Sequence, residues 1–273
     1  MKSFQNSVVV VTGAGSGIGR ATSIVFARLG AKVMLADLKE DRLAEVSDKI
    51  SSEGGFSSAL KVDVSKRDQM ESLAEKVISE FGQVDVVVNN AGVLILGEMR
   101  LLSLEDFAWA MDINFWGVIH GILFFLPYMI ERRQGHIVNI SSANALVPLV
   151  YSSAYNASKT AVHSVSETLR NEIAHYGVGV TTVCPGLTRT DLFDKTKCLT
   201  EAEVTIKFLN NHLKHAKQKG VDPFKIAKKI PSAILRNRAV VRISAETYIL
   251  SWIYRFWPWF YRFWAKKVVK KTT

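Results

Sequence analysis

The sequence predicts an α/β fold: a single domain built on a doubly wound, parallel, seven-stranded sheet. Over residues 1–190, short runs rich in β-branched residues alternate with longer segments of helical periodicity. The strand runs are apolar throughout, which is typical of strands covered by helices on both faces. The chain has 273 residues, of which 48% are hydrophobic, so it can form one large core.

The elements are expected in strict alternation, which indicates parallel strands joined by helical crossovers. Strands are expected at 7–13, 32–37, 58–64, 84–92, 135–142, 177–186 and 239–244. Helices are expected after the first strand as far as Leu29, and then at 39–54, 66–82, 104–131 and 152–176.

The pattern changes after Pro185. Residues 187–221 mix helix and loop and are expected to form a substrate lid. Residues 222–237 predict a helix that is broken or kinked near Pro231, because proline cannot donate a hydrogen bond inside a helix. We find no internal repeat and no domain boundary before residue 244. We therefore expect one catalytic domain over 1–244 and an aromatic and basic tail over 245–273.

The charges are unevenly distributed along the chain. Residues 1–190 contain 17 Lys and Arg against 19 Asp and Glu, whereas residues 191–273 contain 18 against 6. This asymmetry indicates an anionic surface as partner, either phospholipid or nucleic acid, with a solvated basic tail as the alternative. No recognition motif for nucleic acid accompanies it, so nucleic acid is the less favoured partner.

Cysteine usage and the N-terminus indicate a cytoplasmic protein. Cys184 and Cys198 form no CxxC pair, which argues against a disulfide framework and against a metal site. The first expected strand begins at residue 7, which leaves no room for a secretory signal. We also expect no ordinary membrane span.

A glycine-rich loop follows the first strand. Gly13, Gly17 and Gly19 lie between this strand and a helix, where backbone amides and the helix N-terminus favour a pyrophosphate. Asp37 ends the second strand and can accept hydrogen bonds from both ribose hydroxyls of NAD, while it would repel the 2′-phosphate of NADP. Ser16 stands where a basic residue would favour NADP, and Lys39 is read as a surface residue at a helix start. We expect NAD.

Tyr155 and Lys159 are four residues apart and share one helical face. An ammonium group near a phenol lowers the phenol pKa from about 10 and makes tyrosine a usable general acid or base. Tyr151 lies one turn earlier and is expected to line a pocket mouth instead.

These motifs make the chain resemble the short-chain dehydrogenase/reductase family, with its Rossmann-like fold, over residues 1–243. The resemblance rests on TGAGSGIG (12–19), Asp63-Val64, NNAG (89–92), Asn114 in DINFWG, Ser142 in IVNISS, YNASK (155–159) and PGLTRT (185–190). It implies reversible hydride transfer between a secondary alcohol or ketone and a nicotinamide coenzyme.

The resemblance also implies a role for each motif residue. Tyr155 would exchange a proton with the substrate oxygen, and Lys159 would lower its pKa and hold the nicotinamide ribose. Ser142, rather than Ser141, would orient the substrate oxygen, because the family places this serine thirteen residues before the tyrosine. Asn114 would hold a water that links the lysine to solvent.

The coenzyme-binding residues that we expect include the catalytic pair Tyr155 and Lys159. Among the others, Asp63 and Val64 would contact adenine, Asn90 the adenosine ribose region and Thr190 the carboxamide. The complete set of the others is Gly13, Ser16, Gly17, Ile18, Gly19, Asp37, Asp63, Val64, Asn90, Ala91, Gly92, Pro185, Gly186, Thr188 and Thr190.

The expected substrate pocket is apolar. Its candidate residues are Ala143, Val147, Tyr151, Leu187 and Leu192, with Phe193, Val204 and Phe208 further along the lid. An apolar lid favours a lipid, steroid or retinoid-like substrate. The segment MDINFWGVIHG also resembles acetoin and diacetyl reductases, which act on small hydroxyketones, and a non-catalytic NAD-binding protein is a further alternative. We expect a homodimer or homotetramer.

The tail YILSWIYRFWPWFYRFWAKKVVKK (248–271) combines aromatic and basic residues. On one helical wheel, Ser251, Arg255, Arg262, Lys266 and Lys270 share an arc of about 100° and the rest is almost entirely apolar. Pro258 is expected to begin a second helix. Such a surface favours peripheral attachment to an anionic membrane through residues 245–271. Packing over the lid or in a subunit interface is the alternative.

Overall fold

The computed structural model describes residues 3–193, 196–201 and 203–272, with the side chains of all of these except 193, 203, 204, 208, 212, 245, 246, 271 and 272. Its centre is the expected seven-stranded parallel sheet, in the order β3-β2-β1-β4-β6-β7-β9. The strands are β1 (Val8–Thr12), β2 (Lys32–Asp37), β3 (Phe56–Lys61), β4 (Val86–Asn89), β6 (Gly135–Ile140), β7 (Val178–Cys184) and β9 (Val240–Arg242).

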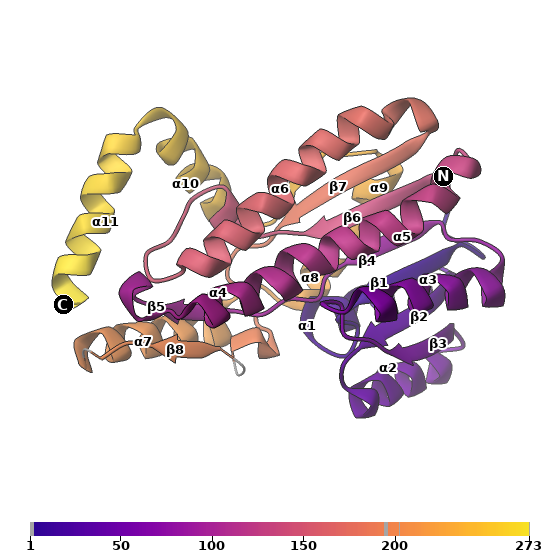
Figure 1. Cartoon of the computed structure of the whole chain (residues 1–273), viewed down its shortest axis with the longest axis horizontal. Helices are drawn as coiled ribbons and strands as arrows, with labels where there is room; N and C mark the ends of the chain where they lie inside the picture. Colours follow the sequence, from indigo (N-terminus) through magenta and orange to yellow (C-terminus); the bar gives the residue numbers. More distant parts are fainter. Residues whose placement is uncertain (1–2, 194–195, 202, 273) are drawn as a thin grey trace.

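Helices cover both faces of the sheet (Figure 1). One core contains residues of α1 (Gly17–Arg28), α2 (Glu40–Ser52), α8 (Pro223–Ala227) and α9 (Lys229–Leu235). The other contains residues of α3 (Arg67–Phe81), α5 (Gly117–Glu131) and α6 (Ser153–Ile173). Successive residues of β1 alternate between the two, since Val9 and Val11 belong to the first core and Val8 and Val10 to the second. Both faces of these strands are therefore buried, as their continuous apolar sequence predicts.

The order in which strands are added to the sheet reverses at β1, although all strands stay parallel. This strand pairs with β2 on one side and with β4 on the other, so the carboxyl ends of β1 and β4 meet where the strand order turns. In open parallel sheets this point forms a crevice that binds ligands. The glycine-rich loop follows β1 and the NNAG segment continues from β4, so two of the predicted motifs meet there.

Several boundaries differ from the sequence expectation. The third strand begins and ends earlier than expected, at Phe56–Lys61, and a two-stranded sheet of β5 (Ile95–Gly97) and β8 (Lys197–Leu199) was not expected. The break near Pro231 is confirmed, because α8 ends at Ala227 and α9 begins at Lys229. Pro231 has no N–H and therefore cannot donate the helical hydrogen bond to the carbonyl of Ala227, four residues earlier.

The long helix expected over 104–131 contains an irregular turn. It consists of α4 (Leu104–Met111), a π-helical turn η2 (Asp112–Trp116) and α5. Asn114 lies in the π turn, and such turns often occur at functional sites.

The same stretch corrects the expectation that no segment could span a membrane. Among the described residues, Leu104–Glu131 forms one helix long and apolar enough to cross a bilayer by length and composition. The sequence between Asp112 and Glu131 lacks Asp, Glu, Lys and Arg. In this fold, however, α5 buries Val118, Ile122 and Phe125 against the sheet. Its apolar character is explained by the core, together with an outer side on which Trp116 and Leu123 are exposed.

The remaining elements form the lid and the tail. The lid contains β8 and α7 (Glu203–Lys219), and the tail forms α10 (Ala245–Phe256) and α11 (Pro258–Thr272). Short 3-10 turns lie at η1 (Met99–Leu101), η3 (Ala143–Ala145), η4 (Ala174–Tyr176) and η5 (Asp191–Phe193). Figure 1 shows α10 and α11 at one end of the molecule, with α11 angled away from α10 and its end near α7.

Two expectations about the tail have opposite outcomes. Pro258 begins the second helix, as expected. The single wheel over 251–270 is wrong, because Trp257 leaves the helical conformation at φ −130° and ψ 60° and the two helices point in different directions. Arg262, Lys266 and Lys270 share a side of α11, while Arg255 belongs to α10.

Candidate active site

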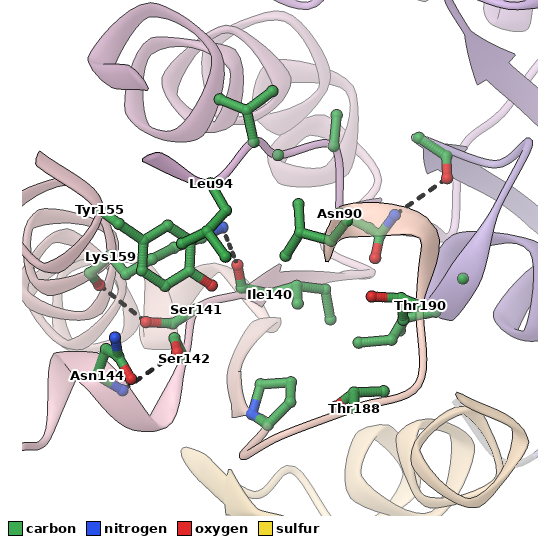
Figure 2. A pocket seen from close by; sticks show the side chains of 18 of the residues that line it. Asn90, Leu94, Ile140, Ser141, Ser142, Asn144, Tyr155, Lys159, Thr188 and Thr190 are labelled. Carbon is green, nitrogen blue, oxygen red and sulfur yellow. Dashed lines mark hydrogen bonds between the residues drawn. The ribbon is translucent and has the colours of Figure 1, made fainter. Parts of the chain in front are cut away.

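A cavity of about 760 Å³ lies at the carboxyl ends of the strands. Its wall contains residues from the loops after β1, β2, β4, β6 and β7, from α6, and from the first turns of α10. Figure 2 shows Tyr155, Lys159, Ser141 and Ser142 gathered on one side of it and Asn90 and Thr190 on the other.

The glycine loop forms the floor of one half of the cavity. Gly13 and Gly17 have positive φ angles of 64° and 53°, which other residues rarely adopt. A Cβ at Gly13 would lie 2.9 Å from the Ala91 Cα, and one at Gly17 would lie 2.9 Å from the Thr190 Cγ2. A side chain at either position would therefore displace the residues opposite. Helix α1 begins at Gly17, which lines this half of the cavity, so the positive end of the helix dipole lies there. No acidic residue in the first turn offsets it.

Asp37 is held by the backbone around it. The Gly15 N–H donates to Asp37 Oδ2 and the Lys39 N–H donates to Oδ1, each at 3.0 Å. Each carboxylate oxygen keeps a further lone pair for a hydroxyl group of a ligand. Lys39 lines the cavity as well. Arg42 is bound across the cleft to Asp191, with 2.9 Å between Arg42 Nη1 and Asp191 Oδ2.

Asn90 ties the loop after β4 to the loop after β1. Its Nδ2 donates to the carbonyls of Thr12 and Gly13 at 2.9 and 3.1 Å, and its N–H donates to the Thr12 hydroxyl at 3.0 Å. Asp63 and Val64 line the cavity at the end of β3. The residues present thus fit an extended dinucleotide: glycines at the floor, a helix N-terminus, and a carboxylate held for hydroxyl groups.

Tyr155 and Lys159 enter the cavity from the first turns of α6. Lys159 is 3% exposed, its Nζ donates to the Ile140 carbonyl at 2.9 Å, and it lies 6.0 Å from the centre of the Tyr155 ring. The two serines of the loop after β6 differ in their partners. Ser141 donates to the Lys159 carbonyl at 2.8 Å, whereas Ser142 Oγ accepts the Asn144 N–H at 3.1 Å. Both serines line the cavity, and the choice of Ser142 over Ser141 stays a prediction.

The pKa values of this group differ from the sequence expectation. Burial raises the pKa of Tyr155, and the nearby Ser142 side chain opposes this only in part. Burial lowers the pKa of Lys159 to about 8. The expected lowering of the tyrosine pKa by the lysine is thus not found, because both groups are desolvated and Lys159 Nζ donates to a backbone carbonyl.

Asn114 stands behind the cavity rather than in its wall. Its Oδ1 accepts the Val93 N–H at 2.8 Å, and its Nδ2 donates to the Val93 carbonyl at 3.0 Å and to the Ser158 hydroxyl at 3.1 Å. A Cβ placed on Gly92 would lie 3.0 Å from Asn114 Oδ1 and 3.4 Å from Lys159 Nζ. Asn114 and Lys159 therefore approach the same point of the backbone.

Most predicted site residues line the cavity. Gly19 does not, because it lies inside α1 against the Gly13 carbonyl. Of the substrate candidates, Ala143, Val147, Leu187 and Leu192 line it.

Tyr151 is the exception among the substrate candidates. It has a φ angle of 59° and packs with Leu94, Leu96 and Leu209, outside the cavity wall of the described residues. The side chains of Phe193, Val204 and Phe208, which were also expected at the lid, lie outside the described residues.

Other wall residues were missed by the sequence interpretation. Among them are Leu94 of the loop after β4, Leu96 of β5, Trp109 of α4, and Thr247 and Leu250 of α10. All but Thr247 are apolar, a type common to core and pocket, so no local signal separates the two. The tail residues come close to the cavity only because α10 begins beside Gly186.

Known proteins are similar to this chain over most of its length. A family model for short chain dehydrogenases matches residues 7–198. The probable oxidoreductase EphD of Mycobacterium tuberculosis is 36% identical over 259 residues, which are 93% of this chain and 44% of EphD. The putative oxidoreductase SadH of the same organism is 40% identical over 188 residues, 68% of each protein. The chain thus spans less than half the length of EphD.

A solved structure agrees with the fold. A short-chain dehydrogenase/reductase from Burkholderia phymatum, in complex with NAD, is 31% identical with a TM-score of 0.87, covering 93% of this chain and 95% of that one. The likeness includes nearly all elements described above.

Replacing Tyr155 with phenylalanine is expected to lower turnover by at least about 100-fold, because the substrate oxygen loses its proton donor. Binding of NADH, measured by fluorescence titration, is expected to change little. The matched variant Tyr151→Phe is expected to keep activity within about tenfold of the wild type. Equal losses in the two variants would contradict the assignment of Tyr155.

The rate of carbonyl reduction is expected to fall as the pH rises through about 8. The lowered pKa of Lys159 means that its ammonium form is present below this pH and is lost above it, while the raised pKa of Tyr155 keeps the phenol protonated. The check is kcat/KM for reduction between pH 6 and 10. A profile that stays flat over this range, or that keeps the same falling limb in Lys159→Arg, would contradict this prediction.

Proposed function

The chain belongs to the short-chain dehydrogenase family, and we propose that it is an NAD(H)-dependent oxidoreductase that interconverts a secondary alcohol and a ketone on a hydrophobic substrate. It is a dehydrogenase or reductase acting on CH–OH groups. The observation that carries the proposal is the convergence of Tyr155, Ser142 and Lys159 on a cavity whose other half has a glycine floor and a helix N-terminus.

The proposed chemistry divides between the coenzyme and the chain. A bound nicotinamide coenzyme would supply or accept the hydride. Tyr155 would donate its phenolic proton to the developing alkoxide during reduction and take it back during oxidation. Ser142, which lines the cavity on the same side as Tyr155, would orient the same oxygen. Lys159 would hold the nicotinamide ribose, and Asn114 would hold the backbone beside Lys159 in place.

The substrate class is inferred from the second half of the cavity. Leu94, Leu96, Trp109, Val147, Leu187 and Leu192 make this part of the wall apolar. A bulky lipid, steroid or retinoid-like ketone would bury more apolar surface there than a small diketone. The small hydroxyketone of acetoin-type reductases remains the alternative.

The tail supports a proposal of peripheral membrane attachment at the cytoplasmic side. Its aromatic side chains are exposed on both helices, for example Trp252 at 60% and Trp259 at 67%. Arg262, Lys266, Lys267 and Lys270 lie exposed beside them on α11. Exposed tryptophan next to cationic residues fits the headgroup layer of an anionic bilayer.

We also infer a homodimer or homotetramer. Trp116 and Leu123 are exposed on the helix that continues from η2 into α5, although the other side of this helix is core. A second copy of the chain would cover these side chains.

The enzyme is expected to reduce long-chain or polycyclic ketones with NADH at a kcat/KM at least about tenfold above that for small diketones, because of the apolar area they bury. A coupled absorbance assay over both classes measures this. Preference for small diketones would support the acetoin-type alternative. Tight NADH binding without turnover of any ketone would contradict the enzymatic proposal.

NAD is expected to be preferred over NADP by at least about tenfold, or about 1.4 kcal/mol, because the Asp37 carboxylate repels a 2′-phosphate. Asp37→Ser is expected to erode this preference in steady-state kinetics. Lys61→Ser, a change of an exposed charged residue beside Asp37 in the strand register, serves as control. A wild type that favours NADP would contradict the coenzyme proposal.

Wild-type protein is expected to sediment with anionic vesicles at low salt and to be released as salt rises. Replacing Trp252 and Phe256 together by serine is expected to weaken binding at least about tenfold, because both rings leave the lipid interface. Phe56→Ser, which changes a half-exposed aromatic residue on β3, is the control. A wild type that stays in the supernatant would contradict membrane attachment.

A further inference from the structure

Helix α10 separates the cavity from the outer surface of the tail. Thr247 and Leu250 line the cavity, and Leu250 is also 42% exposed, so it stands at the cavity mouth. Tyr248, Trp252 and Phe256 follow one another at four-residue spacing on another side of the helix, where all three are exposed. The helix that presents aromatic rings outward is therefore also part of the wall around the substrate.

Tyr261 connects the second tail helix to the same wall. It is 8% exposed, in contrast to Trp259, Phe263 and Trp264 around it, which are exposed. Its ring packs edge-on against Tyr254 of α10, with 5.1 Å between the ring centres. Its hydroxyl donates to the Pro148 carbonyl. A buried hydroxyl that loses its partner is unfavourable, so α11 and Pro148 are expected to move together.

Pro148 belongs to the substrate loop, which we define as residues 143–151. Within it, Ala143, Val147 and Leu149 line the cavity. The carbonyl of Leu149, next to that of Pro148, accepts a hydrogen bond from Asn156 Nδ2 at 2.7 Å. Asn156 directly follows Tyr155.

The same asparagine holds a second point of the loop. Asn156 Oδ1 accepts a hydrogen bond from Asn144 Nδ2 at 3.0 Å. Two adjacent carbonyls of the substrate loop are thus bound by different elements. That of Pro148 is held by the tail through Tyr261, and that of Leu149 by the helix that carries Tyr155 and Lys159.

We propose that Tyr261 is a positioning residue through which docking of the tail on an anionic lipid bilayer orders the substrate loop. The inference rests on the proposed membrane attachment and deepens it. When the tail binds lipid, α11 becomes less mobile. The hydrogen bond from Tyr261 then restrains Pro148, and the substrate loop keeps Val147 and Leu149 in the cavity wall. A lipid-soluble substrate then passes from the bilayer into the cavity past Leu250, without crossing water.

Hydrogen exchange of residues 143–151 tests this coupling without requiring turnover. Wild type, Tyr261→Phe and the control Tyr254→Phe are compared with and without vesicles of phosphatidylcholine containing about 30% phosphatidylserine, a composition that attracts basic segments. The control loses the same chemical group but keeps the Tyr254 ring against Tyr261.

We expect vesicles to slow exchange in this loop about fivefold in the wild type and in Tyr254→Phe, the factor for one net hydrogen bond. Tyr261→Phe is expected to sediment with vesicles equally well but to show no slowing. With a vesicle-borne ketone, its KM is expected to rise by a similar factor, while kcat stays within about twofold of the wild type.

The outcomes separate the proposals. If Tyr261→Phe shows the same vesicle-dependent slowing as the wild type, or the wild type shows none while sedimenting, the coupling through Tyr261 is wrong and membrane attachment stands. If the wild type does not sediment, membrane attachment and the coupling both fail. If exchange responds as expected but no ketone is reduced, the coupling stands and the oxidoreductase proposal fails.

Discussion

The burial of Lys159 beside the partly buried Tyr155 is the constraint on which the rest of the site depends. Taking an ammonium and a phenol out of water is unfavourable unless each keeps a polar partner. Lys159 Nζ has the Ile140 carbonyl at the end of β6, and Ser142, two residues later, lies on the same side of the cavity as Tyr155 (Figure 2). The end of β6 thus supplies the partner of the lysine, and Ser158 on the same helix is held by Asn114. Displacing the end of β6 from α6 would leave a buried charge without a partner.

Much of the fold and half of the site follow from local sequence. Continuous apolar runs predict buried parallel strands, and the glycine loop and the Tyr155–Lys159 spacing are readable because each is a short segment with one conformation. Features that depend on contacts between residues far apart in the chain cannot be predicted from local sequence. The β5–β8 pair joins residues about 100 positions apart. The raised pKa of Tyr155 comes from burial by the whole cavity wall, and Tyr151 leaves that wall through a backbone conformation with a positive φ angle.

The tail shows how one segment can satisfy two of the alternatives that its sequence leaves open. Its composition fits both lipid contact and packing near the lid, and a single helical wheel treats these as rivals. The turn at Trp257 separates two helices. Tyr261 is buried against the protein and Leu250 lies at the cavity mouth, while Trp252 and Trp259 are exposed. The proposed hydrophobic substrate and the proposed membrane contact therefore meet at one place, the mouth of the cavity.

The most direct test of the central claim follows the hydride itself. NADH carrying deuterium on the transferred position of carbon 4 is incubated with the enzyme and a panel of ketones, and the products are examined by mass spectrometry. The account predicts an alcohol with one deuterium on its carbinol carbon, formed by the wild type from a hydrophobic ketone. Unlabelled products, or no alcohol from any ketone despite bound NADH, would contradict it.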